Sequence, residues 1–218
     1  MKPIAISPYM ANIDQRIVDA QRMVMDTLAP DLMFVQALTD KPHGVTVDKL
    51  LWDAYKAGYD TALLMDIDAI PLNPQAVDYT LYRASIGNII GNAQRSNHIN
   101  NDQHLFVAPS FMGIRLQDWV NCGKPSFAET ARGDVAEEVT YAAEAKGYPI
   151  QMYLPIRFDA KPAECDSWKL RDGMPVYGCC TTFGIQEFPV SYHAFQIRYQ
   201  RNVDLFLAKC EEVIQAHS

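Results

Sequence analysis

Two aspartates separated by a single residue, Asp66 and Asp68, are the residues whose type and spacing point most directly to chemistry. They follow a largely apolar run, Thr61 to Met65, that is typical of a strand buried on both faces. Side chains at i and i+2 lie on the same side of a strand, so both carboxylates can reach the crevice beyond its carboxyl end. Burying carboxylates is costly unless something neutralises them, and oxygen ligands suit Mn²⁺ or Mg²⁺. The pattern predicts a metal site; the alternative is two solvated acids at a strand–loop junction.

The elements that position this pair are expected to alternate between strand and helix. Pro3 to Ser7 is typical of a first strand, and Leu32 to Val35 of a second. Asn12 is expected to cap the intervening helix, with Gln15 three residues later as in a capping box. Strands that alternate with helices in this way favour a parallel sheet covered by helices.

The next helix leads directly into the strand before the two acids. Lys41 to Gly44 has the composition of a loop, and Thr46 is expected to cap the helix. Gly58 is placed to end that helix in the left-handed conformation that glycine tolerates. The order strand, helix, strand, helix, strand therefore predicts one α/β domain with a mixed, mostly parallel sheet flanked by helices.

The second half is less regular. Its polar segment, Gly91 to His104, is long enough to suggest a functional loop, and His98 and His104 within it are candidate acceptor-side groups or simply exposed residues. The other expected elements are strands at Ile86–Ile90, Leu105–Pro109 and Ile150–Leu154, a helix from Asp134 to Lys146 closed by Gly147, and a last helix from Asn202.

Composition restricts the class of function. With 218 residues, 49% of them hydrophobic and 21% charged, the chain can form one domain with a substantial core. A formal net charge of −7 argues against a broad face for nucleic-acid backbones, although a divalent cation would still allow nucleotide phosphates to bind.

Targeting signals and cysteine patterns point to the cytoplasm. No apolar run is long enough for a membrane span or a signal peptide. The five cysteines show no C-x-x-C pair and no zinc-finger spacing, so they are expected to be reduced thiols.

The stretch from Val47 to Pro71 resembles the part of GT-A-fold glycosyltransferases that leads into their Asp-x-Asp motif. The resemblance covers roughly residues 3 to 72. It implies a single Rossmann-like domain, with residues 1–72 forming the nucleotide and metal half and residues 73–218 the acceptor side. It also implies a metal-dependent glycosyltransferase that uses Mn²⁺ or Mg²⁺ and a nucleotide-sugar donor, with a UDP-sugar expected. The acceptor would be a saccharide or a modified nucleic-acid base.

The same resemblance implies roles for residues in the first half. Asp66 and Asp68 match the metal-binding motif, and Asp66 would also face the donor. Ser7 and Tyr9 follow the first strand, where such enzymes contact the nucleotide, and Tyr9 could stack on the base or pack on the surface. Lys49 would reach the diphosphate or the sugar, or would remain a solvated helix residue.

In the second half the resemblance implies further candidates. Gly113 would let the backbone approach the donor sugar, unless it only serves strand packing. His193 would be a third metal ligand, or a structural histidine, and Arg198 would help to hold phosphate. Asp134 or Glu138 would be the base of an inverting enzyme, although acids also favour a helix N-terminus for electrostatic reasons.

Three other functions fit parts of the pattern. A haloacid-dehalogenase-type phosphatase also places Asp-x-Asp after a strand, but its nucleophile strand usually opens the fold, and Phe127 to Arg132 lacks strand character. A sugar-phosphate nucleotidyltransferase usually has a glycine-rich loop after the first strand, and Ser7 to Asn12 contains no glycine. A non-catalytic nucleotide- or sugar-binding protein is the third.

Overall fold

A computed structural model describes residues 1–96, 104–160, 168–169 and 176–218 of the chain. Its first half consists of β1 (Pro3–Met10), α1 (Gln15–Leu28), β2 (Met33–Thr39), α2 (His43–Lys56), β3 (Thr61–Met65), β4 (Ala69–Pro71), α3 (Pro74–Ser85) and β5 (Ile89–Arg95). Its second half consists of β6 (Leu105–Arg115), α4 (Leu116–Asn121), α5 (Glu137–Lys146), β7 (Ile150–Phe158), β8 (Trp168–Lys169), β9 (Val176–Tyr177), β10 (Thr181–Ile185), β11 (Phe188–His193) and α6 (Gln200–His217).

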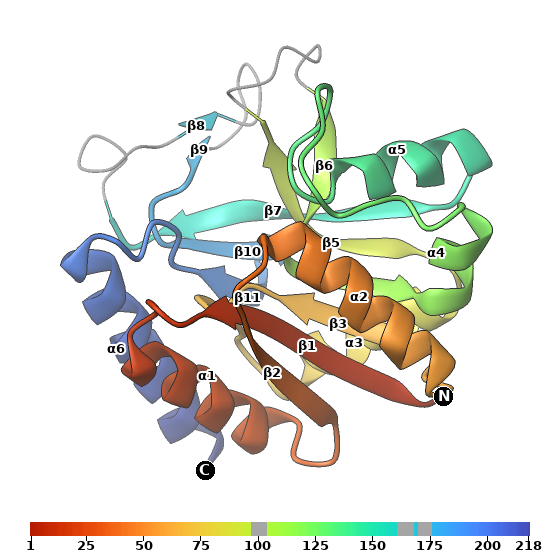
Figure 1. The fold of residues 1–218 in the computed structure, drawn as a ribbon. Coiled ribbons are helices and arrows are strands. Elements are labelled where there is room, and N and C mark those ends of the chain that lie inside the picture. Colours follow the sequence, from red (N-terminus) through yellow and green to blue (C-terminus); the bar gives the residue numbers. More distant parts are fainter. Residues whose placement is uncertain (97–103, 161–167, 170–175) are drawn as a thin grey trace.

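One large mixed sheet organises the fold (Figure 1). Its strand order is β2-β1-β3-β6-β5-β7-β10-β11-β4, and β8 pairs with β9 in a separate ribbon. Parallel pairing joins β1 to β2 and β3, as the alternating pattern predicted, and joins β5 to β7. The remaining pairs are antiparallel, so the prediction of a mixed sheet is confirmed, while parallel pairing is confined to fewer strands than expected.

The segment that carries the two aspartates links two strands that are far apart in the sheet. β3 lies third in the strand order, whereas β4, which follows β3 after only three residues, lies at the far edge beside β11. The register places Ala69 of β4 opposite His193 of β11. A short link between strands so far apart in the order requires the sheet to curl, which brings the end of β11 next to the end of β3.

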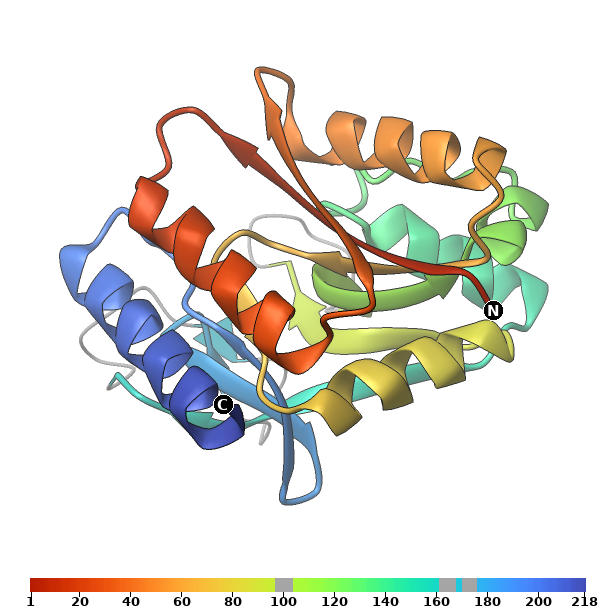
Figure 2. The same cartoon turned by 90° about the horizontal axis from the view of Figure 1, so that it is seen from below.

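Helices cover both faces of this curled sheet (Figures 1 and 2). β3 is buried along its whole length, and its side chains alternate between two cores. Leu64 belongs to the core beneath α2, α4 and α5, whereas Leu63 and Met65 belong to the core with α3. α1 and α6 pack together beside β4 and β11 in a third core.

Three of the predicted helix starts are wrong, and one of them is that of α5, which begins at Glu137 rather than at Asp134. Asp14 caps α1 by accepting a 2.9 Å hydrogen bond from the Arg16 amide, so the cap is not Asn12. α2 begins at His43 rather than after Thr46, whose hydroxyl bonds to the Pro42 carbonyl inside the first turn. Asn and Asp cap helices equally well, so spacing alone did not decide which of them starts α1. At α2 the N-cap residue is Pro42, which makes no side-chain cap hydrogen bond.

Gly58 and Gly147 end α2 and α5 with φ of +77° and +72°, as predicted. β1, β2, β5, β6 and β7 extend further along the chain than their apolar runs indicated, and β5 starts at Ile89 rather than at Ile86. The start of the supposed polar loop, Gly91 to Arg95, is therefore strand β5; residues 97–103, His98 among them, lie outside the described residues.

Helices α3 and α4 were not predicted. A signal for α3 was present, because Asn73 caps it and Pro74 occupies its first turn. Residues Phe127 to Arg132 form no strand, which agrees with the argument against the phosphatase fold.

Not all cysteines are reduced thiols. Cys122, Cys180 and Cys210 are free, but Cys179 is disulfide-bonded, so the prediction is wrong at that residue. In the described parts of the chain, each helix is too short or too polar to cross a lipid bilayer.

Candidate metal centre

Asp66, Asp68 and His193 converge where β3 and β11 end. The His193 Nε2 atom lies 3.3 Å from Asp68 Oδ1 and 3.7 Å from Asp66 Oδ2. One potential ligand atom from each of the three residues lies within 4.8 Å of the other two. The exposed fractions of the three side chains fall from 26% at Asp66 to 11% at Asp68 and 6% at His193. The arrangement can jointly hold a metal ion, as the sequence pattern and the resemblance implied.

Backbone hydrogen bonds fix the turn that carries the two acids. The Asp66 amide donates to the Ser110 carbonyl at 3.2 Å, and the Ala194 amide donates to the Asp68 carbonyl at 2.9 Å. The fully buried Gln21 side chain donates to the Asp66 and Ala69 carbonyls at 2.7 and 2.8 Å. Strands β6 and β11 and helix α1 therefore hold the same turn, which fixes the position of the carboxylates.

His193 is held in place from the segment that follows it. Its ring stacks on Phe195 with 3.6 Å between centroids. Phe195 and Gln196 both have positive φ, at 51° and 42°, a conformation that L-residues adopt only when their surroundings compensate. The buried Asn202 amide supplies compensation by donating to the Ala194 and Phe195 carbonyls at 3.3 and 3.0 Å.

A second histidine, which the sequence analysis placed in a loop, also contacts the acids. His43 is the first residue of α2, and its Nε2 atom lies 3.3 Å from Asp66 Oδ1. Gly44 allows this position, because a Cβ there would overlap the backbone of Phe127 and come within 2.5 Å of Ala128 Cα. No periodic pattern marks a histidine at a helix start, so only the fold reveals this contact.

The electrostatics of the cluster suit a bound cation. Burial raises the pKa of Asp66 and outweighs the opposing charges of His43 and His193. Burial alone would lower the pKa of His193, but the charge and hydrogen bond of Asp68, with Asp66, raise it instead. Without a metal, Asp66 and His193 thus bind protons more readily than usual, and these protons offset the negative charge of the two acids. A divalent ion can replace those protons, since carboxylate and imidazole ligands bind metal in their deprotonated forms.

A cavity of about 230 Å³ opens over the acids. Its walls come from the end of β1, the end of β2, the start of α2 and the segment after β11; they include Tyr9, Thr39, His43, Asp66, Asp68 and Ile197. A larger cavity of about 680 Å³ adjoins it through Ile13 and Ile197. The three candidate metal ligands therefore lie next to a substrate-sized space rather than within the protein core.

The predicted donor contacts are only partly gathered at this cavity. Tyr9 lines it, whereas Ser7 is fully buried behind it with no hydrogen-bond partner for its Oγ atom. Lys49 lies elsewhere, on the exposed side of α2, where its Nζ atom pairs with Asp53 at 2.6 Å. The α2 start at His43 moves Lys49 into the second turn, away from the acids.

Gly113 and Arg198 are also placed apart from the acids. Gly113 pairs with Leu63 in mid-sheet, and a Cβ there would come within 2.8 Å of the Thr80 side chain, so this glycine allows α3 to pack. Arg198 lines the larger adjoining cavity and its guanidinium stacks on Tyr199.

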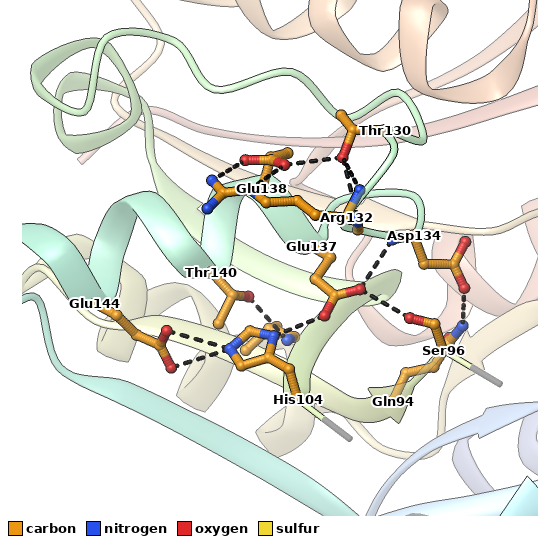
Figure 3. Close-up of polar contacts among 12 residues, drawn as sticks. Gln94, Ser96, His104, Thr130, Arg132, Asp134, Glu137, Glu138, Thr140 and Glu144 are labelled. Atoms are coloured by element: carbon orange, nitrogen blue, oxygen red, sulfur yellow. Dashed lines mark hydrogen bonds and ion pairs between the residues drawn. The ribbon is translucent and has the colours of Figure 1, made fainter. Parts of the chain in front are cut away.

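The two candidate bases lie near the start of α5 (Figure 3). Both carboxylate oxygens of Glu138 bond to Arg132, and one also accepts from Thr130; the Arg132 hydrogen bonds lower the Glu138 pKa. Asp134 accepts from the Val135 amide at 2.8 Å and from Gln94 at 3.4 Å. Arg132 therefore holds the Glu138 carboxylate, whereas the Asp134 carboxylate bonds to the Val135 amide and the Gln94 side chain.

Between these acids lies a buried carboxylate that the sequence analysis did not single out. Glu137 has no exposed surface and accepts hydrogen bonds from Ser96, the Asp134 amide and His104, the last at 2.7 Å (Figure 3). The other ring nitrogen of His104 lies 3.2 Å from Glu144. The His104 side chain therefore connects the start of β6 to α5 and is not that of an exposed loop residue.

The contacts of His104 with Glu137 and Glu144 predict that the folded protein loses stability as the pH rises above the ordinary histidine pKa of 6.5. Burial alone would lower the pKa of His104, but Glu137 and Glu144 raise it overall. Burial alone would raise the pKa of Glu137, but its hydrogen bonds to His104, the Asp134 amide and Ser96 lower it overall. A raised histidine pKa stabilises the fold below pH 6.5, and this contribution disappears as pH rises through the folded value.

The measurement is the free energy of urea unfolding from about pH 5.5 to about pH 9, a range of about 3.5 units that begins below the ordinary histidine pKa and ends well above it. In His104→Gln, whose side chain cannot titrate, the unfolding free energy should fall less steeply with pH. The difference in slope corresponds to one proton and is at most about 1.4 kcal/mol per pH unit. Equal slopes for the wild type and His104→Gln would contradict the prediction.

Comparison with known proteins leaves the family open. No protein-family model and no curated protein sequence matches the chain. Among solved structures it is similar to A197 from STIV, at 12% identity and a TM-score of 0.41 over 70% of this chain and 82% of that chain. It is also similar to a candidate nucleotide-diphospho-sugar transferase from Desulfovibrio desulfuricans G20 (12%, TM-score 0.45, 69% and 79%). A third is a CMP:2-keto-3-deoxy-manno-octonic acid synthetase complexed with CTP (12%, TM-score 0.40, 70% and 89%). At these identities and TM-scores the likenesses support no function for this chain.

Proposed function

We propose that this chain is a metal-dependent glycosyltransferase that moves a sugar from a nucleotide-sugar donor, a UDP-sugar, to an acceptor hydroxyl. The observation that supports this most is the convergence of Asp66, Asp68 and His193 under a cavity at the carboxyl end of β3. Asp66, Asp68 and His193 could hold Mn²⁺ or Mg²⁺, both of which prefer carboxylate ligands, and the ion would stabilise the charge that develops on a departing nucleoside diphosphate.

The cavity walls suggest how the donor lies. Tyr9 offers a ring at the end of β1 for the nucleotide base, and its position supports the division into a nucleotide half (residues 1–72) and an acceptor side (residues 73–218). His43 adds a hydrogen-bond donor next to Asp66, at the amino end of α2, where an anionic phosphate is favoured. Arg198 would act from the adjoining cavity. Lys49 has no part in this proposal.

The acceptor side is assigned to Asp134. If the enzyme inverts configuration, a carboxylate must take the proton of the acceptor hydroxyl. Asp134 is one of the acids near the start of α5, and the Glu137 carboxylate holds its backbone amide at 2.9 Å. Glu138 is held by Arg132 and is less suited to this role.

The proposal is tested by melting the full-length protein with each nucleoside diphosphate, with and without Mn²⁺. We expect UDP to raise the melting temperature only when Mn²⁺ is present, because without the cation the diphosphate would carry its full negative charge next to the two acids. Release of UDP from a panel of UDP-sugars should follow the same metal dependence. If no nucleoside diphosphate shows metal-dependent stabilisation, the proposal is wrong. Hydrolysis of p-nitrophenyl phosphate that is lost in Asp66→Asn would instead favour a phosphatase.

A further inference from the structure

A separate cavity of about 580 Å³ lies between the carboxyl-terminal half of α6 and the part of the sheet formed by β7, β10 and β11. It shares no lining residue with the cavity over Asp66. Helix α6 provides Lys209 and Glu212, β7 provides Arg157, and β10 provides Thr182. This cavity is the size of a small-molecule site, and the proposed glycosyl transfer does not use it.

A buried cation at its wall is the first sign of a binding site. Lys209 is only 7% exposed, although lysine is almost never this buried unless it is paired. Its Nζ atom donates to Glu212 at 2.6 Å and lies 3.8 Å from Asp159, beyond hydrogen-bonding distance. An ammonium group has three donors, so Lys209 keeps capacity for a ligand oxygen.

An orphaned hydroxyl is the second sign. Thr182 is 2% exposed, and among the described residues its Oγ atom has no hydrogen-bond partner. Buried polar groups are nearly always paired, so an unpaired one at a cavity wall indicates a partner that arrives from outside. The Thr182 hydroxyl can rotate, and can both donate and accept.

The charges around the cavity restrict the class of ligand. Lys209 and Arg157 are balanced by three acids: Asp159, which lies 3.5 Å from the Arg157 Nε atom, and the lining residues Glu187 and Glu212. An anionic ligand would have to compete with these acids, and a cationic ligand with the two basic groups. A neutral ligand leaves the ion pairs intact, and its hydroxyls can both donate and accept.

The remaining wall is apolar and comes from Leu72, Ile156, Pro189 and Val213. An apolar wall opposite a few convergent polar groups suits a molecule that has hydroxyls at its edge and C–H groups on its face. We infer that this cavity binds a neutral saccharide, through Lys209 and the Thr182 hydroxyl. The inference does not depend on the metal centre being catalytic.

The test uses saturation-transfer NMR on the full chain with glucose, galactose, mannose, maltose and cellobiose, and with glucose 6-phosphate and glucosamine as charged comparisons. We expect saturation transfer to at least one neutral sugar. In a spectrum that resolves the protein's amides, the same sugar should shift the Thr182 amide resonance. Lys209→Met should weaken that binding at least about tenfold, and the nearly isosteric Thr182→Val about threefold, because each removes one hydrogen bond to the ligand.

Two controls separate this site from the metal centre and from general effects. Lys56→Met, at an exposed residue of α2, and Asp66→Asn should both bind the neutral sugar as the wild type does. Thermal melts establish that each variant is folded, and Thr182→Val keeps the test decisive if Lys209→Met does not fold. The inference is overturned if no neutral sugar binds, if glucose 6-phosphate binds more tightly than glucose, or if folded Lys209→Met or Thr182→Val binds like the wild type.

Discussion

Replacing either Asp66 or Asp68 by Asn should abolish the Mn²⁺-dependent stabilisation of the protein by UDP. A ligand at 100 times its Kd stabilises the native state by about 2.7 kcal/mol. For a chain of this length that corresponds to a melting-temperature rise of roughly 5 to 10 °C in the wild type. An amide oxygen is a weaker ligand than a carboxylate, so the variants should show almost none of that rise. Turnover of a UDP-sugar should fall at least about a hundredfold, since the charge on the leaving group is no longer stabilised.

The metal-free variants should still fold. Burial raises the pKa of Asp66, which means that the charged carboxylate is disfavoured there and that a neutral amide removes an unfavourable charge. Asp53→Asn is a suitable control, because this acid pairs with Lys49 and Lys56 on the exposed side of α2. That control should keep the full Mn²⁺ response. A wild-type response in Asp68→Asn would show that the metal lies elsewhere.

Gly44→Ala should destabilise the protein by about 3 kcal/mol, near the upper end for forcing extra atoms into a packed core. The new methyl would overlap the backbone of Phe127 and Ala128, which cannot rotate away as a side chain can. The first turn of α2 would have to shift, and His43 would then leave its 3.3 Å contact with Asp66. Urea unfolding gives the stability change, and titration of UDP with Mn²⁺ should show weaker binding in the folded fraction.

Gly58→Ala is the matched control at the other end of the same helix. Nothing lies within 4 Å of a Cβ at Gly58, so the substitution meets only the strain of its φ of +77°. That strain is worth about 1 kcal/mol, and binding of UDP with Mn²⁺ should not change. If Gly58→Ala destabilises the chain as much as Gly44→Ala, close packing of α2 on the 127–128 backbone is not what requires the glycine.

The amino-terminal sequence carried enough local information to predict its part of the fold. The apolar run Thr61–Met65 is β3 with the predicted bounds, and Gly58 ends α2 as expected. Where two nearby residues were equally suitable as helix caps, as Asn12 and Asp14 were for α1, the local sequence did not determine which of them starts the helix. In the second half, the apolar runs marked where β6 and β7 start but not how far they continue, because sheet pairing, rather than hydropathy, sets strand length.

The sequence by itself determined that two acids follow a buried strand, which was sufficient to predict Asp66 and Asp68 as ligands. The tertiary structure alone decided which residues surround them. His193 reaches the acids because β11 pairs with β4 at the far edge of a curled sheet, and His43 does so because α2 starts four residues earlier than predicted. Lys49 and Glu138 were plausible by type, yet each is held by a neighbouring ion pair. Contacts between residues more than a hundred positions apart depend on sheet order and curvature, which no local pattern of side chains specifies.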